Sequence, residues 1–296
     1  MSAMFDATAL TPLQLARYRA LRHPSLAIGA GLFALIAFCA VFAPWLAPHD
    51  PIAADAALRL TPPVWSDAGS WVHPLGTDAF GRDVLSRVLH GLRISLGIGL
   101  AVATISMLIG TTLGLVGGYF GGRVDAAVMY LITTKLAMPQ LVVLLALLSV
   151  FGGSVLVLIV VIAALGWDRY ATVIRPLAMR MRRQEFTLAA EVIGASKVRI
   201  LFGELAPNVM DQILVIMTVE MGLVIMIEAA ISFLGLGLPP PTPSLGLMIA
   251  EGRDYMFFLP YLMVIPGVVI FVAEIAIYLL GDGIADLFAP DDRVSR

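Results

Sequence analysis

Charged residues and cysteine are both scarce in this chain of 296 residues. Only 14% of the residues are charged, against about 25% in a typical soluble domain, whereas 59% are hydrophobic and the mean hydropathy is +0.93. This composition excludes an ordinary soluble domain and is that of a polytopic membrane protein. The single cysteine, Cys39, lies in an apolar run, which excludes a disulfide framework and a thiolate metal cluster.

The sequence shows neither a histidine pattern typical of a metal site nor a phosphate-binding motif typical of a nucleotide site. The four histidines lie outside the apolar runs and show no metal-ligand spacing (His23, His49, His73 and His90). No Gly-x4-Gly-Lys-Ser/Thr phosphate loop occurs, so any ATP would have to be bound by another chain. We therefore predict no catalytic residue, no metal and no cofactor in this chain. The net charge of −2 says nothing about partners, and we expect no nucleic acid among them.

The apolar runs predict six membrane-spanning helices. A helix needs about 20 apolar residues to cross about 30 Å of hydrocarbon. The first run, residues 24–48, is uncharged, too long for a cleavable signal peptide, and ends in bulky side chains. The run at 136–167 is too long for one helix, and Phe151-Gly152-Gly153-Ser154 would break it into a hairpin of two spans. The remaining spans are expected at 94–122, at about 212–236 and at about 256–280.

Positive charge is concentrated on one side of these predicted spans. Six spans place both termini on the same side of the membrane, together with an Arg-rich segment at residues 168–208. Because short cytoplasmic loops carry an excess of Lys and Arg, the side with the Arg-rich segment is predicted to be cytoplasmic. That side would hold Arg17, Arg19, Arg22, Arg123, Arg169, Arg175, Arg180, Arg182, Arg183, Lys197, Arg199, Arg293 and Arg296, against Arg59, Arg82, Arg87, Arg93 and Arg253 outside.

The Arg-rich segment contains small residues at a fixed spacing. Leu188-Ala189-Ala190 is followed by Gly194 and Ala195, and later by Glu204-Leu205-Ala206-Pro207. Small side chains give a short helix a smooth face that another protein can grip closely, and Pro207 lacks a backbone donor and would end the run. The spacing resembles the EAA coupling loop of ATP-binding-cassette (ABC) importer permeases, with Leu188, Glu204 and Ala206 departing from that pattern. An ordinary amphipathic loop between two spans is the alternative.

Residues 74–87 carry a second motif, Pro-Leu-Gly-Thr-Asp-Ala-Phe-Gly-Arg-Asp-Val-Leu-Ser-Arg, on the predicted outer side. Thr77 or Asp78 can cap a helix start. Apolar residues then recur at helical spacing, which predicts an amphipathic helix lying in the membrane interface before span two. The motif closely resembles the signature of the second ("C"-type) permease subunit of dipeptide, oligopeptide and nickel ABC importers. Residues 117–125, 228–237 and 281–290 are similar to the same subfamily, so the resemblance covers about residues 15–292.

This resemblance implies an all-α polytopic membrane protein with six transmembrane helices and the type I ABC importer permease fold. It divides the chain into a cytoplasmic tail with the first helix and the start of an external loop (1–60), the rest of that loop with the interfacial helix (61–93), a five-helix core that contains the coupling loop 168–208 (94–290), and a cytoplasmic tail (291–296). The residues that the resemblance assigns to ATPase coupling are Ala189, Ala190, Gly194, Ala195 and Pro207.

The same resemblance implies a multisubunit transporter in the inner (plasma) membrane. Its other parts would be a sister permease subunit in a heterodimer, two ABC ATPase subunits that bind ATP and magnesium, and an extracytoplasmic solute-binding protein. ATP binding would close the ATPases and drag the helix around residues 189–201, so that the spans tilt and open outwards. Peptides are the expected cargo, with nickel chelates, opines or glutathione-like solutes as alternatives. This chain would do no chemistry itself.

Lys135, Glu220 and Glu274 fall inside apolar runs, where neutral residues are expected. A charge at mid-bilayer costs at least about 2.5–3.5 kcal/mol on insertion scales, so such residues usually face a partner or an aqueous path. One interpretation is a buried ion pair of Lys135 with Glu220 or Glu274, with Glu274 favoured. The others are a passage lining that meets a charged substrate, and snorkelling of Lys135 to the interface. A distant alternative is an ion-coupled secondary transporter with Glu220 or Glu274 as proton carrier, which leaves the coupling loop unexplained.

Overall fold

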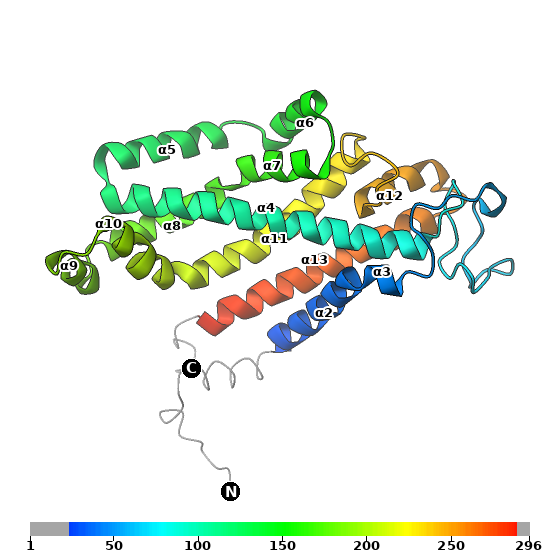
Figure 1. Cartoon of the computed structure of the whole chain (residues 1–296), viewed down its shortest axis with the longest axis horizontal. Coiled ribbons are helices and arrows are strands. Elements are labelled where there is room, and N and C mark those ends of the chain that lie inside the picture. Colours follow the sequence, from blue (N-terminus) through cyan, green and yellow to red (C-terminus); the bar gives the residue numbers. More distant parts are fainter. Residues whose placement is uncertain (1–23, 289–296) are drawn as a thin grey trace, which may run out of the picture.

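The computed structural model describes residues 24–288, and this part of the chain is predominantly helical (Figure 1). The all-α prediction is therefore confirmed. Strand-like pairing in the described range is limited to an isolated bridge between Thr77 and Asp83. The predicted tails before residue 24 and at 291–296 lie outside the described residues. The α-helices are α2 (Pro24–Val41), α3 (Ala43–Leu46), α4 (Val84–Phe120), α5 (Gly122–Leu136), α6 (Gln140–Phe151), α7 (Val155–Gly166), α8 (Asp168–Met181), α9 (Glu185–Val192), α10 (Lys197–Arg199), α11 (Met210–Phe233), α12 (Leu245–Gly252) and α13 (Tyr261–Phe288).

Four helical stretches of the described chain are long and apolar enough to cross a membrane, and a fifth is broken. The four are 84–120, 155–181, 197–233 and 261–287. The fifth consists of α5 and α6, which meet at an angle of 83° on either side of the break before Gln140, where Pro139 has no backbone donor to continue a helix. The apolar helix α2 is shorter and packs against α13. This arrangement is compatible with the six predicted spans.

Helix α4 begins ten residues earlier than span two was expected to begin, at Val84 rather than at residue 94. The helix predicted before span two is present at residues 84–93, where it forms the first turns of one continuous helix of 37 residues. The predicted caps, Thr77 and Asp78, are wrong. The N-cap is Asp83, whose carboxylate accepts a hydrogen bond from the Ser86 amide at 2.8 Å.

The predicted hairpin at 151–154 is confirmed, but its second arm is longer than expected. Helix α6 ends at Phe151, and Ser154 caps α7 by accepting a hydrogen bond from the Val157 amide. Helix α7 then continues through Trp167 into α8, so that Val155–Met181 forms one stretch. The expected end of span four at Trp167 is thus wrong, and the first residues of the Arg-rich segment lie inside the helical bundle.

Glycines on α4 let α8 approach its backbone closely. Gly110, Gly114 and Gly118 recur every fourth residue and face α8. A Cβ atom at Gly110 would lie 2.1 Å from the carbonyl oxygen of Trp167, and one at Gly118 would lie 2.4 Å from that of Arg175. Between helices in lipid, such close backbone packing is a main source of association, because lipid tails are as apolar as the side chains. These glycines therefore set the position of α8 in the bundle.

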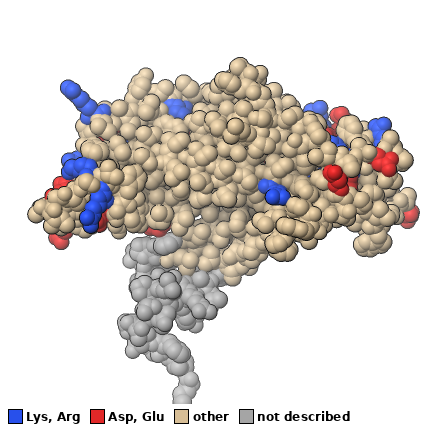
Figure 2. Space-filling view, in the orientation of Figure 1, with Lys and Arg blue, Asp and Glu red and all other residues tan. Residues whose placement is uncertain are grey.

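Charged side chains gather at the two ends of the long axis, and the broad middle visible in Figure 2 carries very few. One end, called the α9 end, is formed by α9, α10 and the end of α4; the other, the α12 end, by α12 and a long loop at residues 47–83 (Figure 1). Helices α2 and α13 are antiparallel, since Gly29 packs on Leu279 and Gly283 on Leu26. The start of α2 and the end of α13 consequently lie on one side. This distribution fits a bundle that crosses the bilayer along its long axis.

Candidate functional site

The predicted coupling loop folds as helix α9, a tight turn, and a distorted helix that leads into α11. Gly194 ends α9 in the left-handed region, with φ +80°, where a glycine meets no steric cost. Its amide donates to the carbonyl of Glu191 at 3.1 Å, and the Ala195 amide donates to that of Ala190 at 3.0 Å. This is the Schellman pattern of helix ends. Gly194 thus has a backbone role that the spacing argument, which used only its small size, did not predict.

Pro207 does not end the helical run as predicted. A single helical stretch extends from Lys197 to Phe233 and includes Pro207. The chain accommodates the missing donor by widening into a π turn at Ile200–Leu205 and tightening into a 3-10 turn at Ala206–Val209. The coupling segment is therefore joined to α11 by continuous helix rather than by a flexible loop.

The α9 end exposes large apolar side chains. Val192 is 86% exposed and Ile193 is 79% exposed. Of the small residues, Ala189 and Gly194 are exposed, Ala195 is half-buried, and Ala190 is buried among the apolar side chains beneath α9. Exposed apolar residues concentrated in this way mark interaction sites. We name this surface the coupling surface after the predicted coupling loop that forms it; its large apolar members are Leu188, Val192, Ile193, Val198 and Phe202.

Two sets of hydrogen bonds hold α9 in place. The Tyr119 hydroxyl, at the end of α4, donates to Glu191 at 2.5 Å, and the ammonium of Lys197 lies 3.0 Å from both of these groups. These hydrogen bonds lower the pKa of the exposed Glu191 carboxyl, so that it stays ionised at neutral pH. The buried Thr187 hydroxyl donates to the carbonyl of Met181 at 2.9 Å. Sequence reasoning missed Glu191 and Thr187, since nothing local to them indicates a partner on α4 or α8.

Two ion pairs lie inside the bundle, with partners different from those predicted. The ammonium of Lys135 lies 2.6 Å from Asp168, and the guanidinium of Arg169 contacts Glu220, which is 1% exposed. The predicted pairing of Lys135 with Glu220 or Glu274 is therefore wrong. The reason is the continuation of α7 into α8, which carries Asp168 and Arg169 into the bundle, where each faces one opposite charge.

Glu274 has neither of these partners. It lies in a groove of about 370 Å³ between α11 and α13, and one of its carboxylate oxygens is buried without a hydrogen-bond partner among the described residues. Its other oxygen would lie 2.6 Å from a Cβ atom at Gly222, so the glycine makes room for it. Glu228, by contrast, is fully engaged in packing, because it accepts hydrogen bonds from the hydroxyls of Ser95 at 3.1 Å and Ser232 at 2.8 Å.

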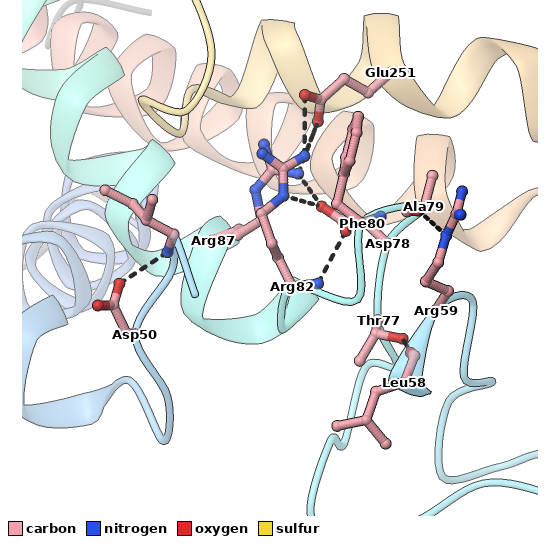
Figure 3. A network of polar contacts seen from close by, with 11 residues as sticks. Asp50, Leu58, Arg59, Thr77, Asp78, Ala79, Phe80, Arg82, Arg87 and Glu251 are labelled. Atoms are coloured by element: carbon pink, nitrogen blue, oxygen red, sulfur yellow. Dashed lines mark hydrogen bonds and ion pairs between the residues drawn. The ribbon is translucent and has the colours of Figure 1, made fainter. Parts of the chain in front are cut away.

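The second motif forms a charged network at the α12 end (Figure 3). Arg82 donates to Asp78 at 2.7 Å and to Glu251 of α12 at 3.0 Å. Arg87 donates to Glu251 at 2.7 Å and also contacts Asp78. The guanidinium groups of both arginines thus lie between the two carboxylates, which come from the long loop and from α12. The motif therefore joins the long loop to α12.

Comparison with known proteins identifies the family of this chain. Residues 110–293 match the family described as binding-protein-dependent transport system inner membrane component. The chain belongs to this family. Members are multi-pass inner-membrane components of ABC importers, which act with ATPase subunits and solute-binding proteins and are not themselves the catalytic parts. A second match, to the N-terminal transmembrane domain of oligopeptide transport permease C, covers residues 11–63.

Similar permeases cover nearly the whole of this one. The di/tripeptide transport system permease protein DppC of Pseudomonas aeruginosa is 37% identical over 92% of this chain and 90% of its own length. The dipeptide transport system permease protein DppC of Haemophilus influenzae is 34% identical over 95% of each chain. The nickel transport system permease protein NikC of Escherichia coli K12 is 36% identical over 88% of this chain and 91% of its own length. The predicted relationship to the second permease subunit of dipeptide and nickel importers is confirmed.

Proposed function

We propose that this permease forms half of the passage of an ATP-driven importer of di- or oligopeptides. The observation that carries the proposal is the coupling surface, which exposes apolar side chains at one end of a chain from an ABC importer family. Peptide cargo is supported by the names of two similar permeases, at 37% and 34% identity. Nickel chelates are the second candidate, because a nickel permease is similar at 36%. Opines and glutathione-like solutes are further alternatives.

ATP and magnesium belong to two partner ATPases in this proposal, and the permease itself binds no nucleotide and does no chemistry. The ATPases dock on the coupling surface. Their closure moves α9, and two connections carry that movement into the bundle: the contacts of Tyr119 with Glu191 and Lys197, which reach α4, and the continuous helix from Lys197, which reaches α11. Both helices then tilt, and the passage opens towards the solute-binding protein.

The passage is completed by a sister permease, packed in a heterodimer against the α11 and α13 side. The groove between these helices is apolar except for a few polar groups. Two carboxylates line it, Asp282 towards the end of α13 and Glu274 near the middle of that helix. A carboxylate without a hydrogen-bond partner is expensive in a membrane unless it meets an aqueous path or a substrate. Glu274 is therefore our passage residue, whereas Lys135 and Glu220 have partners within this chain.

The α9 end is cytoplasmic in this proposal, which thiol labelling can test. In a Cys39→Ala background, Ser66→Cys should react with a membrane-impermeant reagent added to intact cells, because Ser66 is exposed on the long loop. Ser196→Cys, exposed in the turn after α9, should react only after the membrane is opened. The asymmetry follows from the excess of arginine and lysine at the α9 end. The reverse labelling pattern would overturn the orientation.

Reconstituted uptake tests the function. The permease, its sister permease, both ATPases and the solute-binding protein are placed in liposomes. Labelled dipeptide should accumulate only when ATP is present on the side of the membrane that carries the ATPases. Nickel chelates should compete weakly. Uptake driven by a proton gradient without ATP would identify a secondary transporter, and uptake of nickel in preference to dipeptide would change the cargo.

The same assay tests the passage residue. Glu274→Gln should leave assembly of the complex unchanged and alter uptake according to the charge of the dipeptide, with the rates for cationic and anionic dipeptides shifting in opposite directions. Glu228→Gln is the comparison, since Glu228 is enclosed by serine hydroxyls and does not meet the groove. Equal uptake of every dipeptide by wild type and Glu274→Gln would remove Glu274 from the passage.

A further inference from the structure

Three residues that are far apart in the sequence meet at the α12 end. His49 follows the short helix α3, His73 lies in the long loop, and Asp83 is the N-cap of α4. The two imidazole rings lie against each other, with their centroids 4.4 Å apart and their planes tilted by 30°. His73 and Asp83 are buried, while the side chain of His49 is partly exposed at 36%. The cluster therefore has two enclosed residues and one side that a small solute can reach.

The polar atoms of this cluster are spaced as metal ligands are. The Nδ1 atom of His73 lies 2.9 Å from Oδ1 of Asp83, and the Nδ1 atom of His49 lies 3.8 Å from the same oxygen. One candidate ligand atom from each of the three residues lies within 4.8 Å of the other two. Two ligands of a tetrahedral zinc ion, each about 2.0–2.2 Å from the metal, are roughly 3.3 Å apart. These two separations lie on either side of that value, so shifts of about half an ångström would bring both histidine nitrogens to a ligand–ligand distance from Oδ1 of Asp83.

One of these ligand atoms has no hydrogen-bond partner in the part of the chain that the structure describes. The Nδ1 atom of His49 is buried and makes no hydrogen bond within the described residues. A buried polar atom left in this state is costly, and a bound ion would satisfy it. The carboxylate of Asp83 is held in place by Ser86. Its Oδ2 atom accepts hydrogen bonds from the Ser86 amide at 2.8 Å and from the Ser86 hydroxyl at 2.7 Å. Outer-shell hydrogen bonds of this kind orient a metal ligand, and they leave Oδ1 pointing to the histidines.

We propose that His49, His73 and Asp83 bind a divalent transition metal ion, with zinc as the reference ion. Two imidazoles and one carboxylate suit zinc or its neighbours rather than magnesium or calcium, which prefer oxygen ligands. The ion would tie the end of the α2–α3 region, the long loop and the start of α4 together. This site lies at the α12 end, apart from the coupling surface, and does not depend on the proposed cargo or on ATP.

Direct binding to the purified full-length permease tests the site. The protein is prepared in detergent with an affinity tag that contains no histidine, stripped with a chelator, and titrated with zinc chloride by calorimetry. We expect one high-affinity ion per chain. His73→Ala and His49→Ala should each weaken binding by more than the about 10–100-fold that follows loss of an outer-shell partner. Cobalt should give the visible absorption of a tetrahedral site in the wild type and lose it in both variants.

His90→Ala is the matched control. Its ring Nδ1 lies 3.0 Å from the carbonyl of Ser86, one turn further along α4, and it is not part of the cluster. Zinc affinity should be unchanged in this variant. Loss of zinc binding in His49→Ala would not be explained by misfolding, because the side chain of His49 is partly exposed and does not cap α4. In wild type, zinc should also slow hydrogen exchange of residues 47–83. Equal zinc affinity in wild type, His49→Ala and His73→Ala would show an adventitious ion only and overturn the proposal, as would the absence of zinc binding to the wild type.

Discussion

Replacing Val192 by aspartate is expected to prevent the ATPase subunits from binding the permease, without unfolding the permease. Val192 is 86% exposed in the isolated chain, so the change removes no buried contact. In the docked complex it would place a carboxylate in an apolar contact. Loss of a central interface residue costs about 2 kcal/mol or more, which is roughly a 30-fold loss of affinity. Co-purification of the ATPases should be lost, and ATP-driven dipeptide uptake should fall about tenfold or more.

Val72→Asp is the matched control for this experiment. Val72 is similarly exposed, at 61%, but lies on the long loop at the opposite end of the molecule. The variant should retain the ATPases during purification. Both variants should elute from gel filtration like the wild type. Wild-type co-purification and uptake by Val192→Asp would show that the ATPases dock elsewhere.

Gly194→Leu tests the same surface through the backbone. A Cβ atom at residue 194 would have no neighbour within 4 Å, so a side chain has room there. The backbone φ of Gly194, however, is +80°, in the left-handed region. The left-handed region costs an ordinary residue roughly 1–2 kcal/mol, so the turn after α9 should shift. Membrane insertion should be unaffected while uptake falls. Gly194→Asn is the comparison, since asparagine tolerates this conformation. Normal ATP-driven uptake by Gly194→Leu would exclude Gly194 from the coupling site.

Arg169→Leu is expected to reduce folded permease more than any surface substitution. It leaves Glu220 buried without its guanidinium partner. Breaking a buried pair in this way costs about 3–5 kcal/mol in soluble proteins, which is a large part of a total stability of about 5–15 kcal/mol. The measurements are the thermal midpoint in detergent and the yield of monodisperse protein. Both should fall clearly below wild type.

The double variant Arg169→Leu/Glu220→Leu separates pairing from simple loss of arginine. Replacing both members of a buried pair by apolar residues is often neutral, so the double variant should recover much of the thermal midpoint. Arg253→Leu is the control, because the exposed pair of Arg253 and Asp254 at 3.7 Å should contribute at most about 1 kcal/mol. A wild-type midpoint in Arg169→Leu, or a double variant less stable than the single one, would contradict the structural role of this pair.

The sequence by itself determined the membrane class, the family and the break at residues 151–154. This break could be predicted because glycine acts on the backbone within a few residues of itself. The coupling segment is predicted from a similarly local signal, the fixed spacing of its small residues. The structure places this segment on an exposed apolar surface, and its role in coupling stays a prediction.

Tertiary structure alone decided which distant side chains meet. Lys135 pairs with Asp168 and Glu220 with Arg169, two residues that the sequence pattern places in a loop, because no local signal indicates that α7 continues past Trp167. That continuation depends on glycine packing between α4 and α8 and on the neutralisation of each buried charge by a partner from another helix. The histidine cluster is hidden for the same reason. Its spacing exists only in space, because the course of the long loop, and not any local pattern, brings His49 and His73 to the cap of α4.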